Sequence, residues 1–441
     1  MRSGQYRKGS LTLAGTVAMG TGVMIGAGIF ALTGQVAEFA GDLFPLAFLL
    51  AAIISGFSAY SYIKVSNKYP NAGGIAMILE RAYGPSTVTG GAALLMAFSM
   101  IINESLVART FGTYTLQLFG IEGGVLVPLL AIGLIVIAFG INIADNEFIS
   151  SVSKVTAVLK IGGILAFALV ALWAGGFAFR PVTDGFANTT SGGGFFAGVA
   201  IAILAYKGFT TITNSGDEVK QPEKNVGRAI MISLAICTVI YLLVCYAVGS
   251  TLTVPEIVAA KDYSLAEAAR PALGDYGLWF TVAIAIIATA SGLLASLFAV
   301  SRMLAMLTDM HLIPHRHFGM PGTIQKHTLV YTVVAAGLLA AFFDLSRIAS
   351  LGAIFYLVMD MIIHWGVFRQ LRQDVGAAPA ILLCAILLDA LALSAFLILK
   401  WQADPSIIII ALTGMLAIFA FERFFLQRMR ETAGGHHSGR G

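Results

Sequence analysis

Polar and ionisable side chains stand inside several long apolar stretches of this 441-residue chain. Such a group is expensive in an apolar environment unless it faces a partner, water or a bound solute, so each position is a candidate for binding ions or moving protons. The candidates are Asn103, Glu104, Arg109, Lys160, Lys207, Asp360 and His364. They predict recognition of a small polar solute and not an enzyme, because no nucleophile–base motif and no phosphate-binding loop accompanies them.

The spacing of two pairs leaves alternatives open. Glu104 and Arg109 are five residues apart, about 140° round a helix, so each should reach another helix, either in a structural ion pair or along a transport path. Asp360 and His364 share one helical face, with Asp389 in the next apolar stretch, and form either a proton relay or a buried packing pair. No metal site is predicted, since neither carboxylates nor cysteines stand at ligand spacing from the loop histidines His311, His315, His317 and His327.

Apolar residues dominate the composition. The chain is 58% hydrophobic and 11% charged, with a mean hydropathy of +0.86, which excludes a soluble globular protein. A helix needs about 20 apolar residues to cross the hydrocarbon core of a membrane. Twelve stretches are candidates for transmembrane helices, the ninth of them short: 12–38, 44–66, 87–118, 124–143, 147–175, 194–216, 227–250, 276–308, 328–343, 347–368, 379–399 and 406–426.

Glycines interrupt the first of these stretches at Gly20, Gly22, Gly26 and Gly28. Each glycine costs a helix about 1 kcal/mol relative to alanine, so the helix either breaks here, leaving a solute site, or uses the small residues for close packing against neighbours. The sixth stretch is interrupted in the same way at 205–209, by a lysine and a glycine. Paired breaks in corresponding helices of two halves are typical of secondary transporters.

Basic residues divide unevenly between the two sides of the predicted membrane. With a cytoplasmic N-terminus, most of the 27 lysines and arginines fall on the cytoplasmic side. The opposite side receives only Arg180, Lys261, Arg270, Arg347 and Lys400. Cytoplasmic loops carry such an excess of basic residues, so we expect a multi-pass protein of the cell membrane with both termini in the cytoplasm. The same distribution accounts for the net charge of +4 without nucleic acid.

Four motifs, in this order, resemble the amino acid-polyamine-organocation superfamily of secondary transporters. The resemblance covers roughly residues 10–430 and is most specific at Gly26-Ala27-Gly28-Ile29-Phe30, Pro70-Asn71-Ala72-Gly73-Gly74, Tyr206-Lys207-Gly208-Phe209 with Asp217-Glu218-Val219-Lys220-Gln221-Pro222, and Ser301-Arg302-Met303 running on to Leu312-Ile313-Pro314.

The resemblance implies an all-α integral membrane protein with about 12 transmembrane helices. Ten of them would form the leucine-transporter-type 5+5 inverted repeat, and two would be peripheral. The expected division is a cytoplasmic N-terminus 1–11, a first repeat 12–175, an extracellular loop 176–193, a second repeat 194–368, the peripheral helices 369–426 and a cytoplasmic tail 427–441.

The resemblance also implies a substrate site at the two breaks. The substrate carboxylate would meet backbone N–H groups of Gly26, Ala27 and Gly28, and its ammonium group would meet carbonyls near Met24, Ile25, Ala205 and Tyr206, with Gly208 and Phe209 completing the second break. Lys160 matches the lysine that occupies the sodium position in proton-linked relatives. Lys207 and Thr210 depart from the common pattern, and they favour an acidic substrate or one whose carboxylate pairs with Lys207.

We therefore expect a permease for amino acids or related small organic solutes that works by alternating access, without sodium, in a proton-linked manner. The alternatives are an exchanger of amino acids, amines or organic acids and, from another class, a channel or receptor-like membrane component. The expected partners are the substrate and the lipid bilayer; no cofactor is expected, and the sequence leaves the exact substrate and the oligomeric state open.

Overall fold

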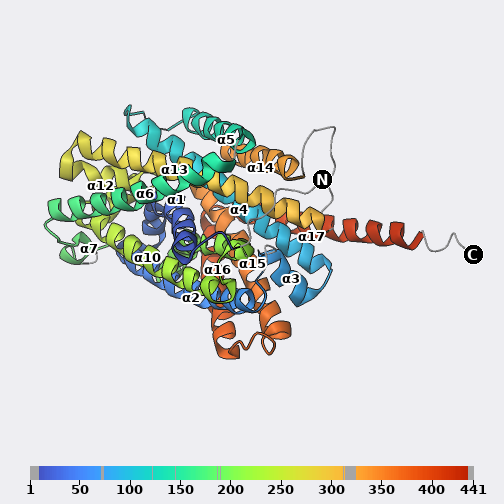
Figure 1. Ribbon diagram of the computed structural model, residues 1–441. Helices are drawn as coiled ribbons and strands as arrows, with labels where there is room; N and C mark the ends of the chain where they lie inside the picture. Colours follow the sequence, from blue (N-terminus) through green and yellow to red (C-terminus); the bar gives the residue numbers. More distant parts are fainter. Residues whose placement is uncertain are drawn as a thin grey trace, which may run out of the picture.

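Helices make up almost the whole of the computed structural model (Figure 1). It describes residues 9–70, 74–121, 123–144, 146–185, 187–188, 190–310, 312 and 324–435. The long helices are α1 (Leu13–Ala40), α2 (Phe44–Lys68), α4 (Thr87–Gln117), α5 (Leu126–Ala144), α6 (Asn146–Ala174), α8 (Gly192–Tyr206), α10 (Pro222–Thr251), α13 (Asp275–Asp309), α14 (Ile324–Phe342), α15 (Leu345–Gly366), α16 (Pro379–Ala403) and α17 (Pro405–Gly435). Short helices connect them: α3 (Gly74–Tyr83), α7 (Arg180–Thr183), α9 (Phe209–Asn214), α11 (Val254–Ala259) and α12 (Ser264–Leu273), with the 3-10 helices η1 (Gly41–Leu43) and η2 (Gly216–Glu218) and the π-helix η3 (Val367–Leu371).

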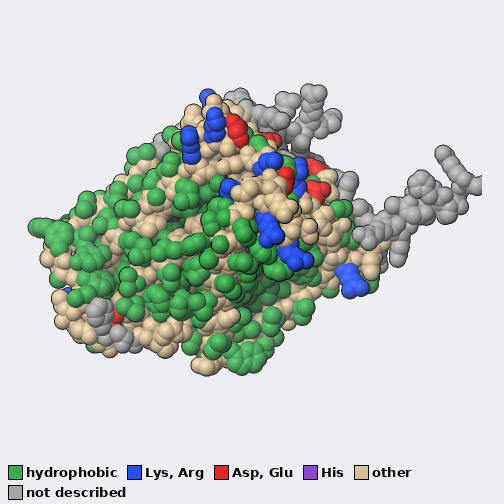
Figure 2. All heavy atoms as spheres, turned by 90° about the horizontal axis from the view of Figure 1, so that it is seen from below, with side chains coloured by type: hydrophobic (Ala, Val, Ile, Leu, Met, Phe, Trp, Pro, Cys, Tyr) green, Lys and Arg blue, Asp and Glu red, His purple; other side chains and the backbone are tan. Residues whose placement is uncertain are grey.

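Eleven stretches of the described chain are long and apolar enough to cross a membrane. One of them, Gly28–Lys68, contains the end of α1 and all of α2, which Gly41 separates by its left-handed backbone (φ 53°). With α1 and α2 taken as two helices, every one of the twelve predicted stretches contains a long helix. Figure 2 shows a face covered mainly by hydrophobic side chains, with charged side chains gathered toward one end. Large apolar residues such as Ile137, Leu169 and Leu416 are more than half exposed, as lipid-facing side chains would be.

The helix contacts follow a regular scheme. The pair α4–α5 corresponds to α13–α14, α4–α15 to α13–α6, α4–α14 to α13–α5, α1–α6 to α8–α15, and α1–α10 to α8–α2. Each pair becomes the other when the first five long helices are exchanged with the next five. The α1 helix lies in the interior of the bundle, in contact with α8, α10 and α13 (Figure 1).

The first predicted break is wrong: α1 runs as one helix from Leu13 to Ala40. The glycines of α1 instead allow close packing against neighbouring helices, which was the alternative to a break. A Cβ on Gly28 would lie 2.9 Å from Ala205 Cα on α8, whereas one on Gly26 would lie 3.6 Å from Gly292 Cα on α13. Neighbouring helices therefore approach the backbone of α1 directly, and dispersion contacts along this approach offset the cost of glycine in a helix.

The second predicted break is confirmed. Helix α8 ends at Tyr206 and α9 begins at Phe209, with Lys207 and Gly208 between them. Thr210 N donates to Lys207 O at 3.1 Å and Thr211 N donates to Gly208 O at 3.2 Å, so tight i→i+3 hydrogen bonds replace the helical pattern here.

The segment before α1 pairs with the turn that follows α9. Leu11 and Val219 form an isolated parallel bridge. Gly9 N donates to Asp217 O at 3.1 Å, Leu11 N to Glu218 O at 2.7 Å, and Lys220 N to Leu11 O at 2.8 Å. These three bonds join the start of α1 to η2.

Candidate functional site

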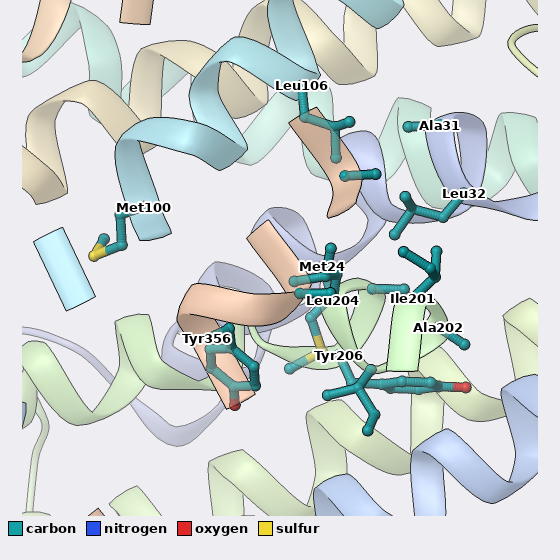
Figure 3. Close-up of a cluster of buried hydrophobic side chains, with 14 of the residues drawn as sticks. Met24, Ala31, Leu32, Met100, Leu106, Ile201, Ala202, Leu204, Tyr206 and Tyr356 are labelled. Carbon is teal, nitrogen blue, oxygen red and sulfur yellow. The ribbon is translucent and has the colours of Figure 1, made fainter. Parts of the chain in front are cut away.

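A small cavity lies where the break between α8 and α9 faces α1, α4 and α13. Its volume is about 30 Å³, and a buried water needs about 10–15 Å³ by this measure, so the cavity has room for water but none for an amino acid. Figure 3 shows buried side chains in this region, with Met24 and Leu204 close together. The lining residues are Val23, Met24, Gly28, Met100, Asn103, Leu204, Ala205, Lys207, Gly208, Thr210, Thr211 and Ser296.

Lys207 lines this cavity and is buried. Its Nζ donates to Ser99 O at 2.8 Å and to Ser99 Oγ at 3.2 Å, and lies 5.8 Å from the centre of the Tyr356 ring. An ammonium group has three N–H donors, so these two bonds leave one for a further acceptor. Lys207 is thus a buried amine at the break with one N–H donor beyond its two bonds to Ser99.

Two polar residues of α4 lie beside the same cavity. Asn103 lines it directly. Glu104 is buried, and its Oε1 accepts a hydrogen bond at 3.1 Å from Ser296 on α13, which also lines the cavity. Its other oxygen, Oε2, has no hydrogen-bond partner among the described residues. Glu104 is therefore a polar group with spare acceptor capacity next to the break.

Arg109 lies away from this cavity. Its Nη1 donates to Ala340 O on α14 at 2.8 Å. Glu104 and Arg109 each contact a different helix, as their spacing predicts, and within the described chain they make no ion pair with each other. Arg109 therefore joins α4 to α14, and nothing in its contacts connects it to a solute.

Tyr241 on α10 is the residue of the site that the sequence missed. Its hydroxyl bridges the two central helices: it lies 2.6 Å from Met24 O on α1 and 3.0 Å from Ala205 O on α8. These are two of the carbonyls expected to meet the substrate ammonium. Tyr241 stands in an apolar stretch without any distinctive spacing, so no sequence signal marked it.

The N–H groups expected to receive a carboxylate lie inside the continuous helix α1, at Gly26, Ala27 and Gly28. Main-chain N–H groups in a helix interior already have carbonyl partners. Ile25 and Phe209, also candidates, are fully buried, as is Tyr206, whose ring lies 5.1 Å from that of Tyr241. Of the predicted substrate-site residues, Met24, Gly28, Ala205, Lys207 and Gly208 line the cavity, and the predicted backbone donors of α1 are not free.

Lys160 on α6 contacts α1 directly. Its Nζ donates to Gly22 O at 2.8 Å, and the residue is only 4% exposed. A Cβ at position 22 would lie 3.9 Å from the ammonium nitrogen, an ordinary contact, so an alanine there would also leave room for the lysine. The lysine thus places a positive charge on the backbone of α1, two turns before the end of the cavity lining at Gly28.

The other predicted pair lies apart from the cavity. Asp360 and His364 on α15 meet Asp389 on α16, all three buried. Of the loop histidines, His311, His315 and His317 fall outside the described residues, and His327 is buried at the start of α14. The described part of the chain therefore has one group of ligand-type side chains that could share an ion, and it does not include His327.

Comparisons with known proteins place these observations in a family. The sequence profile described as "Amino acid permease" matches residues 11–421. The chain is similar to "Inner membrane transport protein YbaT" of Escherichia coli, 28% identical over 92% of this chain and 94% of that protein. It is also similar to "Branched-chain amino acid permease BcaP" of Lactococcus lactis, 27% identical over 82% of each chain. "Serine/threonine exchanger SteT" of Bacillus subtilis is 27% identical over 62% of each chain. With a profile that covers nearly the whole chain and a helical membrane fold to match, this protein belongs to the amino acid permease family.

Proposed function

We propose that this chain is a sodium-independent, proton-linked amino acid permease that works by alternating access around α1 and the α8–α9 break. The observation that carries the proposal is the small cavity at the break, which is lined by Lys207 and by Ser296, the hydrogen-bond partner of Glu104, whose Oε2 has no partner among the described residues. Lys207 could pair with the carboxylate of an amino acid and Glu104 with its ammonium group. The cavity is too small to hold an amino acid, as expected for a transporter whose substrate site has collapsed. Alternating access then requires α1 and α8 to separate.

We further propose that residues 12–175 and 194–368 are two repeats of opposite orientation. The paired helix contacts support this, because exchanging the two sets of five helices maps one contact onto another. Five crossings are an odd number, so two successive halves of this kind enter the membrane from opposite sides. Since α1 and α8 are equivalent in this scheme and contact each other, we propose that the axis relating the two repeats runs between them, near the cavity.

Lys160 is proposed as the coupling residue. Its ammonium occupies the space between α6 and α1 and binds Gly22 O at 2.8 Å, where a bound cation would otherwise contact α1. A lysine in this position supplies the charge without sodium. When it loses its proton, the contact with α1 weakens and the helix is free to move, which links proton movement to the conformation of α1.

The substrate is proposed to place its carboxylate against Lys207. The third N–H donor of this ammonium and the small polar side chains of Thr210 and Thr211 line the same cavity. For the substrate ammonium, the nearest acceptors are the free oxygen of Glu104 and the carbonyls that Tyr241 now holds. The names of two relatives, a branched-chain amino acid permease and a serine/threonine exchanger, support an amino acid as the substrate without fixing its side chain.

Uptake into proteoliposomes tests the proposal. Radiolabelled amino acids are offered with a pH gradient in sodium-free buffer, and uptake is expected to saturate, to follow the gradient and to be unchanged by added sodium. Lys160→Ala should abolish it while the protein remains monodisperse. A strict requirement for sodium refutes the coupling proposal, and sodium-independent uptake that ignores pH leaves Lys160 a structural cation.

The alternatives give different results in the same vesicles. An exchanger takes up label only when unlabelled substrate is preloaded. A channel shows neither saturation nor counterflow, and a receptor-like component shows binding without uptake. Each outcome assigns the cavity to a different class of protein.

The proposed location is the cell membrane, with both termini in the cytoplasm. Exposed positions on the two sides are Lys224 at the start of α10 and Asp184 after α7. In a background without the native cysteines, Asp184→Cys should react with an impermeant thiol reagent in intact cells, and Lys224→Cys should react only after the membrane is permeabilised. The reverse pattern refutes the orientation.

A further inference from the structure

We propose that Asp360, His364 and Asp389 form a site for one divalent transition-metal ion of the zinc type, which fastens α16 to α15 and α2. The proposal does not depend on transport. It concerns a group of side chains that the substrate cavity does not use, and its test measures metal and not uptake.

The distances within this group suit a shared ion. His364 Nε2 lies 3.4 Å from Asp360 Oδ2 and 3.5 Å from Asp389 Oδ2, and one ligand atom from each residue lies within 4.8 Å of the others. Ligand atoms about 2.0–2.1 Å from one tetrahedral zinc ion are roughly 3.3–3.4 Å apart. An N–H···O hydrogen bond would bring the same atoms to about 2.7–3.2 Å. The imidazole nitrogen is nearly equidistant from the two carboxylates and makes no well-formed hydrogen bond with either.

Unsatisfied hydrogen-bonding atoms at this group also indicate a bound ion. His364 Nε2 and both carboxylate oxygens of Asp389 are buried without a hydrogen bond in the described part of the chain. Leaving such atoms unsatisfied costs about 1–3 kcal/mol each, and more where a charge is involved. Since one ligand atom from each of the three residues lies within 4.8 Å of the others, a single bound ion could contact all three residues.

Hydrogen bonds from α2 orient Asp360 and His364, as is common for metal ligands. Asp360 Oδ1 accepts a hydrogen bond at 2.5 Å from Tyr62, and Oδ2 accepts one at 2.5 Å from Ser58. His364 Nδ1 lies 2.8 Å from Ser61 Oγ, also on α2. Metal-binding histidines and carboxylates are commonly oriented by such outer hydrogen bonds. With Nδ1 donating to Ser61, the Nε2 atom presents its lone pair to the ion.

Charge balance favours a divalent ion. Two carboxylates and a neutral imidazole carry a charge of −2, and among the described residues no lysine or arginine forms an ion pair with Asp360 or Asp389. An uncompensated charge in this interior costs several kcal/mol. One divalent ion brings the total to zero, whereas protons would have to be added at two separate groups to do the same.

The site lies behind the α8–α9 break. The ring of Tyr62, whose hydroxyl binds Asp360, packs edge-on against Phe209, the first residue of α9, with centroids 5.3 Å apart. An ion that fixes Asp360 also fixes Tyr62, and with it the wall against which α9 rests. Its expected effect is to keep α2, α15 and α16 together as one support while α8 and α9 move.

The test is the metal content of the full chain as isolated. The protein is expressed with added Zn²⁺, purified through an affinity tag without histidine, passed through gel filtration with a chelator and measured by mass spectrometry of the elements. Close to one zinc ion per chain is expected. His364→Ala and Asp389→Asn should each lower the content by roughly tenfold or more. The matched control, His327→Ala, removes another buried histidine and should leave the content unchanged.

Two results overturn the proposal. A wild-type protein that is monodisperse and free of metal shows that protons balance the carboxylates, and a His364→Ala protein that keeps its zinc places the ion elsewhere. Should the variants fail to fold, zinc-edge X-ray absorption of the wild-type protein decides. The expected signature is one imidazole with oxygen ligands, and a sulfur ligand contradicts it.

Discussion

The contact between Gly28 of α1 and Ala205 of α8 gives the sharpest single prediction. A Cβ on Gly28 would lie 2.9 Å from Ala205 Cα, 3.1 Å from its Cβ and 3.3 Å from its carbonyl oxygen. Carbon atoms pack best at about 3.5–4.0 Å, and these neighbours are backbone atoms or a Cβ, which cannot rotate away. Gly28→Ala must therefore move α1 and α8 apart by roughly half an ångström or more.

The expected cost follows from two opposing terms. Overpacking of this kind costs about 1–3 kcal/mol, while alanine gains about 1 kcal/mol over glycine in a helix. The net loss of stability is therefore up to about 2 kcal/mol. The functional loss should be larger, because Ala205 lines the cavity and its carbonyl binds Tyr241. Uptake should fall severely even where the protein still folds.

Two glycines provide matched controls. A Cβ on Gly26, half a turn away, would meet its nearest neighbour at 3.6 Å, and a Cβ on Gly56 in α2 would meet nothing within 4 Å. Both alanine variants should equal or exceed the wild type in thermal stability in detergent, and only Gly28→Ala should lose uptake. Equal melting temperatures and uptake for Gly26→Ala and Gly28→Ala would refute the packing argument.

Three further outcomes follow from described contacts. Tyr241→Phe removes the one O–H donor shared between Met24 O and Ala205 O, a contact worth about 0.5–1.5 kcal/mol, so its melting temperature should fall and the ratio of uptake to binding should change. Lys207→Ala should shift binding among acidic, neutral and basic amino acids, and an unchanged order of preference would mean that Lys207 faces away from the substrate. In the connector before α16, a hydrogen bond from Tyr69 lowers the pKa of Asp374. The contact is therefore complete above the ordinary aspartate pKa of about 3.9 and is lost as pH falls through the lowered pKa; hydrogen exchange of residues 372–378 should rise there, and Asp374→Asn should remove that pH dependence.

The sequence predicted the helices and the general place of the site well, because both depend on local signals. Apolar length alone located the long helices, and a lysine next to a glycine located the break between α8 and α9. Glycine content could not decide between a break and close packing in α1. That choice depends on what lies opposite each glycine, and Ala205 is almost 180 residues away in the chain.

Tyr241 and the Asp360 group also depend on contacts between helices, which local sequence signals do not reveal. A tyrosine in an apolar stretch has no periodic or charge signal, and only the fold brings its hydroxyl to two carbonyls of different helices. The spacing of Asp360 and His364 put them on one face, yet Asp389 joins them from another helix. The sequence places Asp389 in the next apolar stretch, but only the fold shows that its carboxylate lies beside His364.

The short bridge between Leu11 and Val219 has a consequence for how the molecule moves. Its three backbone hydrogen bonds are together worth ~1.5–4.5 kcal/mol, enough to make the segment before α1 and the segment after α9 move as one unit. A movement that opens the bundle at this end must move both hydrogen-bonded segments together, or else break the bonds between them. The continuous helix α1 and the broken pair α8–α9 are thus joined through backbone hydrogen bonds at this end, so a displacement of one is expected to displace the other.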